Sequence, residues 1–455
     1  MKKKAKQPLE KVKALSNWIS RAPAIFSYPV LYTEFLASQD ENSQKIKKML
    51  SAGIVERFGK CHSFNDEPRF EQYYAQHGFD ANENLHGSSV DLDAERAKIK
   101  AIGECFERLS LIMPRTAKTI NASFEELSQL KKQAINPAEC LNFPDKYLPV
   151  PRKEYEEVLR KDRMKWVLGK NILDNSPAFL PYQLVFLPTT KEFGSDPLIR
   201  NPITTGTACG DSFEDAAYRG LMECVERDSN MLSWLAKREV PRIILDTKFF
   251  AEIEKYLARY SLKLFVWDFT TDIGIPSIMA VITDDSGLGP AVSAGTKADL
   301  NPSKAVTGAI YEALHSRFWI RSIYYTRKTR ITRPSQIIDL QDRGLYWFDR
   351  KMLKNIDFLI YAKKSVKLSK MNDLSTQENS KLALAAKMLK QKNIESYLID
   401  ITLPAVKNAG FHVVRTIAPE LHPMHLNENN PYHYSKRLEE LLKGWKVNEI
   451  PAPFL

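Results

Sequence analysis

A short acidic pattern occurs twice in this chain, at positions far apart, and it limits how the chain can fold. The first copy, in 101–110, contains Glu-Cys-x-Glu-Arg-x-Ser, and the second copy, in 204–235, has the same residue types at the same spacing. Carboxylates three residues apart lie on one face of a helix. Each copy therefore predicts a helix with a pair of glutamates on one side, and we expect the rest of the chain to bring the two helices together.

Signals for the start and the end of these helices flank both copies. Gly206 and Gly210 bracket a predicted loop, and Ser212 stands three residues before Asp215, as an N-cap residue does. Apolar residues fill the opposite side of both helices, and Pro114 is expected to end the first one. The two helices are therefore predicted to be largely buried, with their acidic stripes facing a polar site.

Buried carboxylates need a charged partner, because a carboxylate without one takes up a proton. The repeat supplies two arginines, Arg108 and Arg227, which are too few for its four carboxylates. A divalent cation would supply the missing charge, and oxygen ligands with retained waters suit Mg²⁺ beside a nucleotide phosphate. The alternative is a pair of solvated faces with local ion pairs. The shared Cys, Arg and Ser favour the metal site, since a solvated face does not require them. The predicted metal ligands are Glu104, Glu107, Glu223 and Glu226.

The composition excludes several classes of protein. The chain has 455 residues, of which 44% are hydrophobic, and it carries a net charge of +11. A basic chain favours an acidic partner such as nucleic acid, a nucleotide or an acidic peptide. No zinc-finger, RRM or KH pattern supports a nucleic-acid binder. No signal peptide and no apolar run long enough to span a membrane are seen, and the five cysteines lack a C-x-x-C pair. We therefore expect a cytoplasmic protein with reduced thiols and no membrane contact.

Strand and helix signals alternate along the chain, which predicts a mixed α/β, or α+β, fold. The predicted strands are 183–187, 262–269, 277–282, 291–294, 357–361, 396–401 and 411–417. The predicted helices outside the repeat are 124–132, 154–161, 303–320 and 381–390. A Gly/Ser loop is predicted over 85–93, ahead of the first acidic helix.

The last eight residues, 448–455, are predicted to stay extended because Pro451 and Pro453 disfavour a helix. Ile450, Phe454 and Leu455 are apolar, so we expect this tail to be buried rather than frayed.

Three stretches together resemble the core motifs of the YcaO family. They are 101–110, 206–228 and 305–317, with supporting similarity at 53–55, 413–421 and Arg437-Leu438. The resemblance implies a YcaO-type fold with mixed sheets flanked by helices. It divides the chain into an N-terminal region for partner contact, 1–80, and an ATP-binding catalytic domain with a proline-containing tail, 81–455.

Within that family, the proline-containing end is similar to that of azoline-forming cyclodehydratases, the separate D component of thiazole/oxazole-modified peptide and bacteriocin biosynthesis. The resemblance implies that ATP and Mg²⁺ activate a backbone amide by O-phosphorylation. Thiazoline or oxazoline then forms from Cys, Ser or Thr of a ribosomally made precursor peptide. The expected partners are that peptide, a leader-binding ubiquitin-activating-like protein, a flavin dehydrogenase and a second copy of the chain. The alternatives are thioamide or amidine formation and a non-catalytic YcaO-like scaffold.

The resemblance also assigns roles to single residues. It places the metal ions on the four glutamates of the repeat. The residues implied in nucleotide binding are Lys100, Asp211, Asp215, Arg227, Glu312 and Arg317. The residues implied in catalysis are Arg227, Pro453 and Leu455. The chain departs from the family pattern at four positions, where the family often has Ser, Ser, Asn and Glu. These positions are Lys100, Ala208, Asp211 and Asp215.

Overall fold

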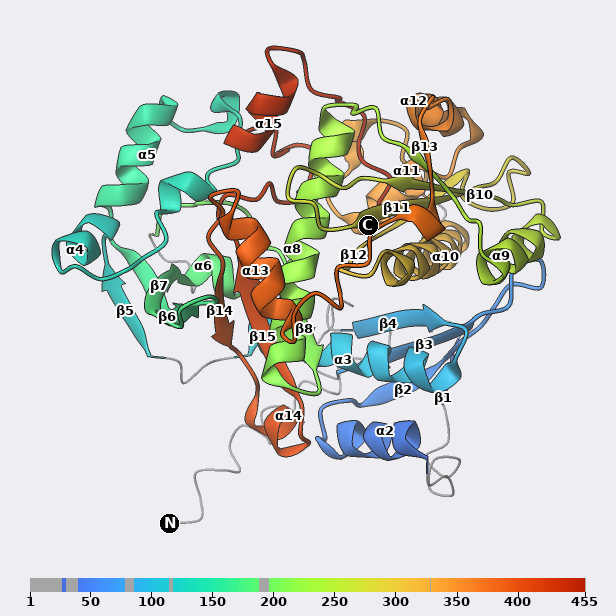
Figure 1. The fold of residues 1–455 in the computed structure, drawn as a ribbon, viewed down its shortest axis with the longest axis horizontal. Helices are drawn as coiled ribbons and strands as arrows, with labels where there is room; N and C mark the ends of the chain where they lie inside the picture. The colour runs from blue at the N-terminus through green and yellow to red at the C-terminus, as the bar shows by residue number, and fades with distance from the viewer. Residues whose placement is uncertain are drawn as a thin grey trace.

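Three sheets flanked by helices make up the described part of the chain, and the strands within them pair almost entirely antiparallel (Figure 1). The computed structural model describes residues 27–29, 40–77, 86–113, 118–187, 196–327 and 329–454. This arrangement confirms the predicted mixed α/β, or α+β, fold with sheets flanked by helices.

The first sheet has the order β1-β2-β3-β4 and is antiparallel throughout. Its strands are β1 (Ser27–Pro29), β2 (Arg57–Cys61), β3 (Glu71–Gln76) and β4 (His86–Asp91). The stretch 85–93, predicted as a loop, is thus mostly β4. Gly87 explains the close packing of this strand on a helix, since a Cβ there would lie 2.1 Å from the carbonyl oxygen of Ala101. The β3–β4 pairing crosses the predicted boundary between residues 80 and 81.

The second sheet has the order β12-β11-β10-β9-β13, with one parallel pair, β13 with β9. Its strands are β9 (Arg242–Ile244), β10 (Lys263–Asp268), β11 (Ser277–Thr283), β12 (Val292–Ala298) and β13 (Ser365–Lys367). All seven residues of β11 are buried, as expected for a strand covered on both faces.

The third sheet has the order β5-β6-β14-β15-β8, and β7 pairs with β6 beside this path. Its strands are β5 (Thr119–Ala122), β6 (Met164–Asn171), β7 (Pro177–Pro181), β8 (Thr207–Gly210), β14 (Tyr397–Asp400) and β15 (His412–Ile417). The segment bracketed by Gly206 and Gly210, predicted as a loop, is therefore an edge strand of this sheet.

The helices connect and cover the three sheets. They are α2 (Glu41–Ser51), α3 (Ala94–Ile112), α4 (Phe124–Gln129), α5 (Arg152–Lys161), α6 (Tyr182–Val185), α8 (Phe213–Leu235), α9 (Lys248–Ala258), α10 (Pro302–Arg327), α11 (Leu340–Tyr346), α12 (Asp357–Ile360), α13 (Lys381–Lys390), α14 (Pro404–Asn408) and α15 (Lys436–Leu442). Short 3₁₀ turns occupy Pro137–Cys140, Asp145–Tyr147, Pro334–Gln336, Arg350–Ile356 and Leu368–Lys370.

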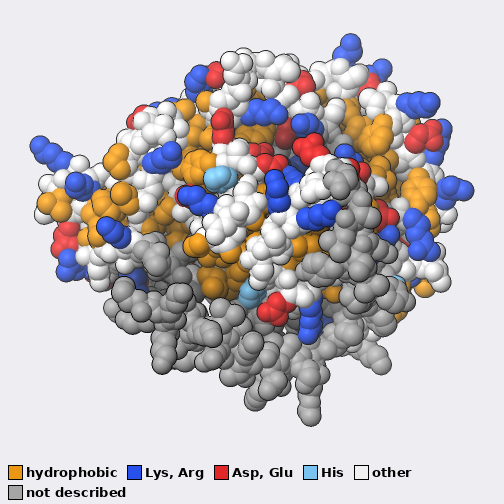
Figure 2. Space-filling model, turned by 90° about the horizontal axis from the view of Figure 1, so that it is seen from below, with side chains coloured by type: hydrophobic (Ala, Val, Ile, Leu, Met, Phe, Trp, Pro, Cys, Tyr) orange, Lys and Arg blue, Asp and Glu red, His pale blue; other side chains and the backbone are white. Residues whose placement is uncertain are grey.

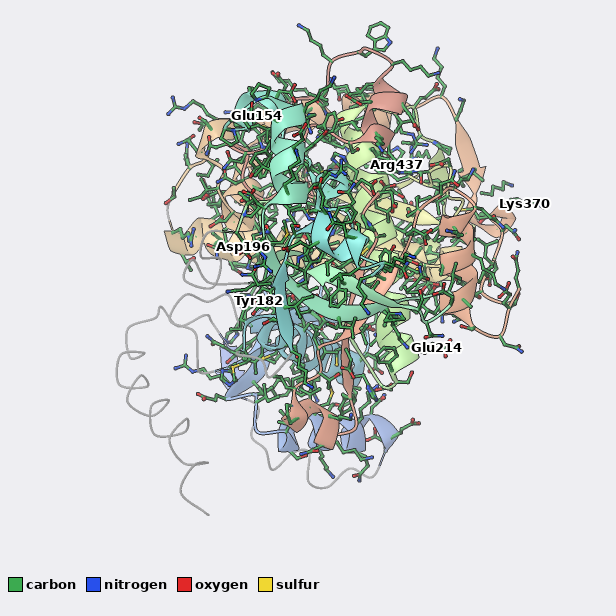
Figure 3. The ribbon with its side chains drawn as sticks, turned by 90° about the vertical axis from the view of Figure 1, so that its left-hand side faces the viewer. Glu154, Tyr182, Asp196, Glu214, Lys370 and Arg437 are labelled. Carbon is green, nitrogen blue, oxygen red and sulfur yellow. The ribbon has the colours of Figure 1, made fainter. Side chains whose placement is uncertain are left out.

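Helix α8 stands between the second and third sheets, where it is drawn in green at the centre of Figure 1. Its N-cap is Ser212, whose side chain accepts a hydrogen bond from Asp215 N at 3.1 Å, as predicted. Figure 3 shows Glu214 near the lower end of this helix and Arg437 in the upper half of the molecule. The helix packs on β8 and β15 on one side and on β12 and β11 on the other. Residues of α8 therefore reach the interior between two sheets.

Helices α3 and α10 bring the first sheet to this centre. Helix α3 packs on β4 and β3 and also contacts β8, and α10 packs on β12 and β11 and contacts β4. Because both repeat helices touch β8, the fold brings the two acidic copies side by side, as the sequence predicted.

Two predicted strands are wrong, because 183–187 and 357–361 contain the short helices α6 and α12. Both segments are short apolar runs, whose periodicity does not distinguish a strand from a buried helical turn. Pro181 immediately precedes α6, and a proline fits the start of a helix because its missing N–H is not needed there.

The C-terminal tail is buried against the end of α8, as predicted from its apolar residues. Asn448 N donates to Leu235 O at 2.7 Å, and the indole of Trp234 donates to Ile450 O at 2.7 Å. Phe454 has no exposed surface. The tail is therefore part of the hydrophobic core up to Phe454, and Leu455 lies outside the described residues.

All five cysteines are free, in agreement with the prediction of reduced thiols. Burial raises the pKa of Cys105 and Cys224 to about 12, so these thiols stay protonated at neutral pH. Within the described ranges, no helix is both long enough and apolar enough to cross a membrane.

A cluster of histidines near the C-terminus makes stability depend on pH. Burial lowers the pKa of His422 to about 3 and that of His433 to about 4, and His425 adds to both shifts. An unfolded histidine titrates near 6.5, so the unfolded chain gains protons first as the pH falls. We expect His433→Asn to gain stability relative to the parent protein as the pH falls from about 6.5 to 4, measured by urea unfolding. A difference in unfolding free energy that does not change with pH would contradict this.

Candidate functional site

Glu107 of α3 lies where the two acidic helices, α3 and α8, meet. Its Oε1 accepts a hydrogen bond from Cys209 N, in β8, at 2.6 Å. Burial raises the pKa of Glu107 to about 8, and the neighbouring carboxylates Glu104 and Glu223 raise it further. Glu107 therefore lies between a glutamate of its own helix and one of α8, and the two copies of the pattern face one site.

Two further glutamates are oriented by backbone N–H groups. Glu104 accepts from Ser88 N at 2.8 Å and forms an ion pair with Arg108 at 2.7 Å. Burial opposes ionisation, but Arg108 and the Ser88 N–H outweigh it and keep the pKa of Glu104 below its usual value. Glu223 accepts from Gly206 N at 2.9 Å, and burial raises its pKa.

Glu226 is the most enclosed member of the group, with 2% of its surface exposed. It accepts from Thr296 Oγ1 at 2.8 Å and from Ala298 N at 3.3 Å, both in β12. Glu312 of α10 accepts from Thr296 N at 2.7 Å. Burial raises the pKa of Glu312 to about 7, and Glu226 contributes to the shift. The site thus extends from α3 and α8 to β12 and α10.

Together these carboxylates form a row in which each member is affected electrostatically by the next. The row consists of Glu104, Glu107, Glu223, Glu226 and Glu312. Three cations stand beside it, namely Arg108, Arg227 and Lys297. Carboxylates outnumber cations, and the raised pKa values of Glu107 and Glu312 mean that protons make up part of the missing positive charge, which a bound cation would replace.

The glutamates of the row do not surround a single metal-sized position. In the parts of the chain that the structure describes, no three His, Cys, Asp or Glu residues lie close enough together to hold a metal ion. Mg²⁺ characteristically takes one or two carboxylates and completes its shell with waters and phosphate oxygens. An open acidic row with raised pKa values at Glu107 and Glu312 fits that kind of binding.

Arg227 lies beside both glutamates of the α8 pair. Its guanidinium nitrogens lie 3.8 Å from carboxylate oxygens of Glu223 and of Glu226, and 12% of its side chain is exposed. This places a buried cation directly beside the acidic row, as the resemblance implied for a phosphate-contacting arginine.

Lys297 was not singled out from the sequence, yet it lies in the row. Its Nζ is 3.8 Å from Glu226 Oε2, and its stem packs on Gly308, where an added Cβ would lie 2.7 Å from Lys297 Cγ. Burial opposes its charge, but Glu226 and Glu312 outweigh burial and raise its pKa. In the sequence, Lys297 falls between the predicted strand 291–294 and the predicted helix 303–320, and nothing there reveals its partner on α8.

Three predicted nucleotide-binding residues form ion pairs elsewhere around the site. Lys100 pairs with Asp91 at 2.7 Å, and Asp211 pairs with Lys45 at 2.5 Å. Asp215 pairs with Arg219 of its own helix at 2.9 Å. Each would have to exchange this partner for a nucleotide group.

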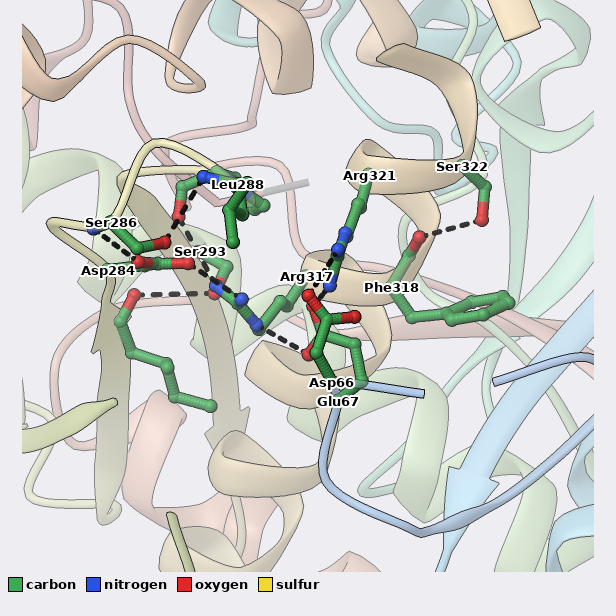
Figure 4. A network of polar contacts seen from close by, with 12 residues as sticks. Asp66, Glu67, Asp284, Ser286, Leu288, Ser293, Arg317, Phe318, Arg321 and Ser322 are labelled. Carbon is green, nitrogen blue, oxygen red and sulfur yellow. Dashed lines mark hydrogen bonds and ion pairs between the residues drawn. The ribbon is translucent and has the colours of Figure 1, made fainter. Parts of the chain in front are cut away.

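Arg317 is occupied by a buried ionic network (Figure 4). Its Nε donates to Glu67 at 2.7 Å, and its Nη2 donates to Asp284 at 2.8 Å, while 2% of the residue is exposed. Glu67 also accepts from Arg321 at 2.6 Å. Arg317 would have to exchange these two buried carboxylates for a phosphate, so its predicted role in nucleotide binding stays a prediction.

The tail residues implied in catalysis are only partly described. Pro453 is buried and has no group that can transfer a proton, and Leu455 lies outside the described residues. Ala208, one of the departures from the family pattern, is buried in β8 opposite Val414. It therefore contributes to the sheet and offers no side-chain hydrogen bond.

Seen from below, the surface carries a group of charged side chains of both signs near its middle, with hydrophobic side chains on either side (Figure 2).

Comparison with known proteins gives one matching family and several relatives. The family model described as YcaO cyclodehydratase, ATP- and Mg²⁺-binding, matches residues 91–422. A protein of Methanothermobacter thermautotrophicus is 26% identical over 335 residues, 72% of this chain and 79% of that protein. A Rhizobium leguminosarum protein from the tfuA 3′ region is 30% identical over 260 residues, 52% of this chain and 57% of that protein. Both relatives are uncharacterized. The matched range includes every glutamate of the acidic row.

Solved structures share the fold at low identity. A heterocyclase in complex with substrate and cofactor gives a TM-score of 0.72 at 20% identity, covering 97% of this chain and 60% of that one. YcaO from Methanopyrus kandleri, bound with AMPPCP and Mg²⁺, gives 0.60 at 16% identity, with coverage of 87% and 95%. The E. coli microcin synthetase McbBCD complex gives 0.59 at 18% identity, with coverage of 87% and 96%. The chain thus spans about three fifths of the heterocyclase.

Proposed function

Because this chain belongs to the YcaO family, we propose that it is an ATP- and Mg²⁺-dependent cyclodehydratase acting on a ribosomally made precursor peptide. In the proposed reaction, the thiol or hydroxyl of Cys, Ser or Thr attacks the preceding carbonyl carbon. The carbonyl oxygen takes up the γ-phosphoryl group of ATP, which releases ADP, and this oxygen then leaves as part of the phosphate. The attacking group and the amide nitrogen each lose a proton, so the ring keeps a C=N bond.

The acidic row of α3, α8 and α10 is the observation that carries this proposal. We assign Glu104, Glu107, Glu223 and Glu226 to hold Mg²⁺, which when bound would neutralise the triphosphate oxygens. Backbone N–H groups of Ser88, Cys209 and Gly206 fix one oxygen of each of three of these glutamates. This anchoring sets their orientation before any ligand binds.

Arg227 is proposed to stabilise the transferred phosphoryl group, because it is the arginine placed between Glu223 and Glu226. Glu312, Lys100, Asp211 and Asp215 are kept as proposed nucleotide contacts. Asp211 and Asp215 stand at the start of α8 and would release Lys45 and Arg219 on binding.

Lys297 is proposed as an additional nucleotide contact. We expect Lys297→Met to raise the KM for ATP by about tenfold, because a charge-assisted contact to phosphate is lost. Steady-state ATP consumption measures this, with Lys304→Met, an exposed lysine at the start of α10, as control. Equal KM values for the parent protein and Lys297→Met would remove Lys297 from the site.

The proposed partners are the precursor peptide, a leader-binding ubiquitin-activating-like protein that contacts residues 1–80, a flavin dehydrogenase and a second copy of the chain. The microcin synthetase among the structural neighbours is a complex and was also solved with pro-MccB17 bound. The proposed location is the cytoplasm, supported by the free thiols.

Mass spectrometry of the peptide after incubation with ATP, Mg²⁺ and the partner protein tests the reaction. Ring formation removes one water from the peptide, whereas thioamide formation replaces oxygen by sulfur. A peptide that gains sulfur, or ATP that is never consumed with all partners present, would contradict the proposal.

The role of the tail requires a small change. Phe454 is fully buried, so deleting the whole tail would damage the core. Removing Leu455 alone leaves the buried Phe454 in place. We expect this variant to lose more of its ring-forming activity than of its nucleotide affinity.

A further inference from the structure

A cavity of about 490 Å³ lies at one end of the first sheet, and the proposed function uses none of the described residues that line it. Its walls come from the end of β2, the β2–β3 loop, the start of β3 and Leu92, which follows β4. These strand ends meet at one edge because the sheet is antiparallel. A space of this size can hold a small ligand or a short piece of a peptide.

Three polar side chains in the cavity wall have unused hydrogen-bonding groups. They belong to Ser63, Asn65 and Arg69. Within the ranges that the structure describes, none of the three side chains makes a hydrogen bond or an ion pair, and the main-chain N–H of Arg69 donates to Tyr256. A hydroxyl, an amide and a guanidinium together offer many more donors than acceptors. The wall therefore suits a ligand group that accepts several hydrogen bonds.

The charges in the cavity wall favour an anion. Lys60 and Glu71 neutralise each other across 2.7 Å. Arg69 adds a positive charge that no carboxylate of the described chain pairs with. A carboxylate fits a guanidinium beside further N–H and O–H donors.

The cavity also has an apolar side. Leu92 is 46% exposed, and the ring of the buried Phe70 lies in the same wall. An inorganic anion would leave this apolar surface unused, whereas a peptide presents apolar side chains next to its carboxylates. Burial raises the pKa of the lining thiol of Cys61 to about 12, so this cysteine stays protonated and is not a nucleophile. The cavity is therefore suited to recognition rather than to covalent chemistry.

The cavity is fixed to the same elements as the acidic row. Glu67 of the β2–β3 loop is held by Arg317 of α10 at 2.7 Å (Figure 4). Leu92 connects β4 to α3, and within this unit Ser88 N donates to Glu104 at 2.8 Å. A ligand in the cavity would thus be held at a set position relative to the acidic row, which reduces the cost of ordering it there.

From these features we propose that the cavity binds a carboxylate of a peptide, with Arg69, Ser63 and Asn65 as donors and Leu92 against a neighbouring apolar side chain. An acidic side chain and a peptide C-terminus present the same carboxylate chemistry. Resting on the proposed function, the peptide is the precursor peptide, bound through a segment outside its ring-forming residues. The binding itself does not need nucleotide or turnover.

Isothermal titration of the full chain without nucleotide tests the cavity with three hexapeptides. The first alternates Leu and Glu and is blocked at both ends, the second alternates Leu and Gln and is blocked likewise, and the third is the Leu/Gln peptide with a free C-terminal carboxylate. Binding at least about tenfold tighter for the first than for the second assigns the cavity to acidic side chains. The same advantage for the third assigns it to a peptide C-terminus. Either result supports the cavity, and equal affinities or no binding for all three overturn it.

Arg69→Met separates the cavity from a general attraction of peptides to a chain with a net charge of +11. Its side chain is exposed and its main-chain bond to Tyr256 is kept, so the fold should persist. We expect this variant to bind the preferred peptide at least about tenfold more weakly. Arg350→Met is the matched control, an exposed arginine without an ion pair in the described parts of the chain, and should change the affinity by less than about twofold. Equal affinities of Arg69→Met and the parent protein overturn the proposal.

Ring formation, measured separately, keeps this inference distinct from the proposed function. In that assay Arg69→Met should raise the KM for the precursor peptide by about tenfold and leave the KM for ATP unchanged. A parent protein that binds the hexapeptides and forms no ring contradicts the proposed function and leaves the cavity in place. A parent protein that forms rings and binds none of the hexapeptides overturns the cavity alone.

Discussion

Glu107→Gln is expected to make the ligand-free protein more stable and at the same time to reduce ATP turnover by about a hundredfold or more. The amide of glutamine can still accept the hydrogen bond from Cys209 N, which the carboxylate accepts at 2.6 Å. It carries no charge, so the cost of burying a carboxylate between Glu104 and Glu223 disappears. The loss of turnover follows because the same carboxylate is proposed to hold Mg²⁺.

The sign of the stability change follows from the pKa. Burial raises the pKa of Glu107 from 4.5 to about 8, so the parent protein loses stability as the pH rises through this window. The advantage of Glu107→Gln should therefore be largest above pH 8, where it is expected to be about 1–2 kcal/mol. Urea unfolding in the presence of a chelator measures it.

Glu104→Gln is the matched control, because it lies one turn away in the same helix. Its carboxylate forms an ion pair with Arg108, and its pKa is held below the usual value. Removing that charge leaves Arg108 unpaired, so this variant should be less stable than the parent protein. Both variants should lose ATP turnover. A Glu107→Gln protein with undiminished turnover would show that Glu107 does not hold the metal.

Glu67→Gln should destabilise the protein by about 3–5 kcal/mol. Glu67 is buried and accepts from both Arg317 and Arg321, at 2.7 and 2.6 Å (Figure 4). Removing its charge leaves two guanidinium groups in the interior with too little compensation. The network joins the segment between β2 and β3 to α10, so its loss weakens the attachment of the first sheet.

Asp66→Asn gives the matched control for this network. Asp66 pairs with the same Arg321 at 2.7 Å, but 51% of its side chain is exposed. Ion pairs that reach solvent contribute about 0–1 kcal/mol, so this variant should unfold nearly as the parent protein does. Thermal or urea unfolding measures the stability of the Glu67→Gln and Asp66→Asn variants relative to the parent protein. Equal losses of stability for both would mean that the burial of Glu67 does not matter.

Local signals in the sequence predicted the helices well. Ser212 caps α8, and α13 spans Lys381–Lys390, the range predicted from its periodicity. The strands β10, β11, β14 and β15 also appear where apolar, β-branched runs predicted them. Errors occurred where the signal was weak, as in 183–187 and 357–361. There, a few apolar residues fit a buried turn of helix as well as a strand.

The acidic site was predictable only in part. The repeat revealed the glutamates because both copies carry the same types at the same spacing. Their partners were not visible, since Cys209, Thr296 and Lys297 lie on strands whose register depends on the whole fold. Arg317 matched a family position, yet the distant Glu67 and Asp284 determine its environment.

Nucleotide binding to Glu107→Gln, Glu223→Gln and the double variant, with and without Mg²⁺, tests most directly whether α3 and α8 act as one site. Isothermal titration with AMPPCP is the readout. We predict that each single change removes most of the Mg²⁺-dependent affinity and that the double change adds little, because both residues serve the same ions. Two results would contradict the shared site. The first is an AMPPCP affinity of the parent protein that is the same with and without Mg²⁺, and the second is an affinity of either single variant equal to that of the parent protein.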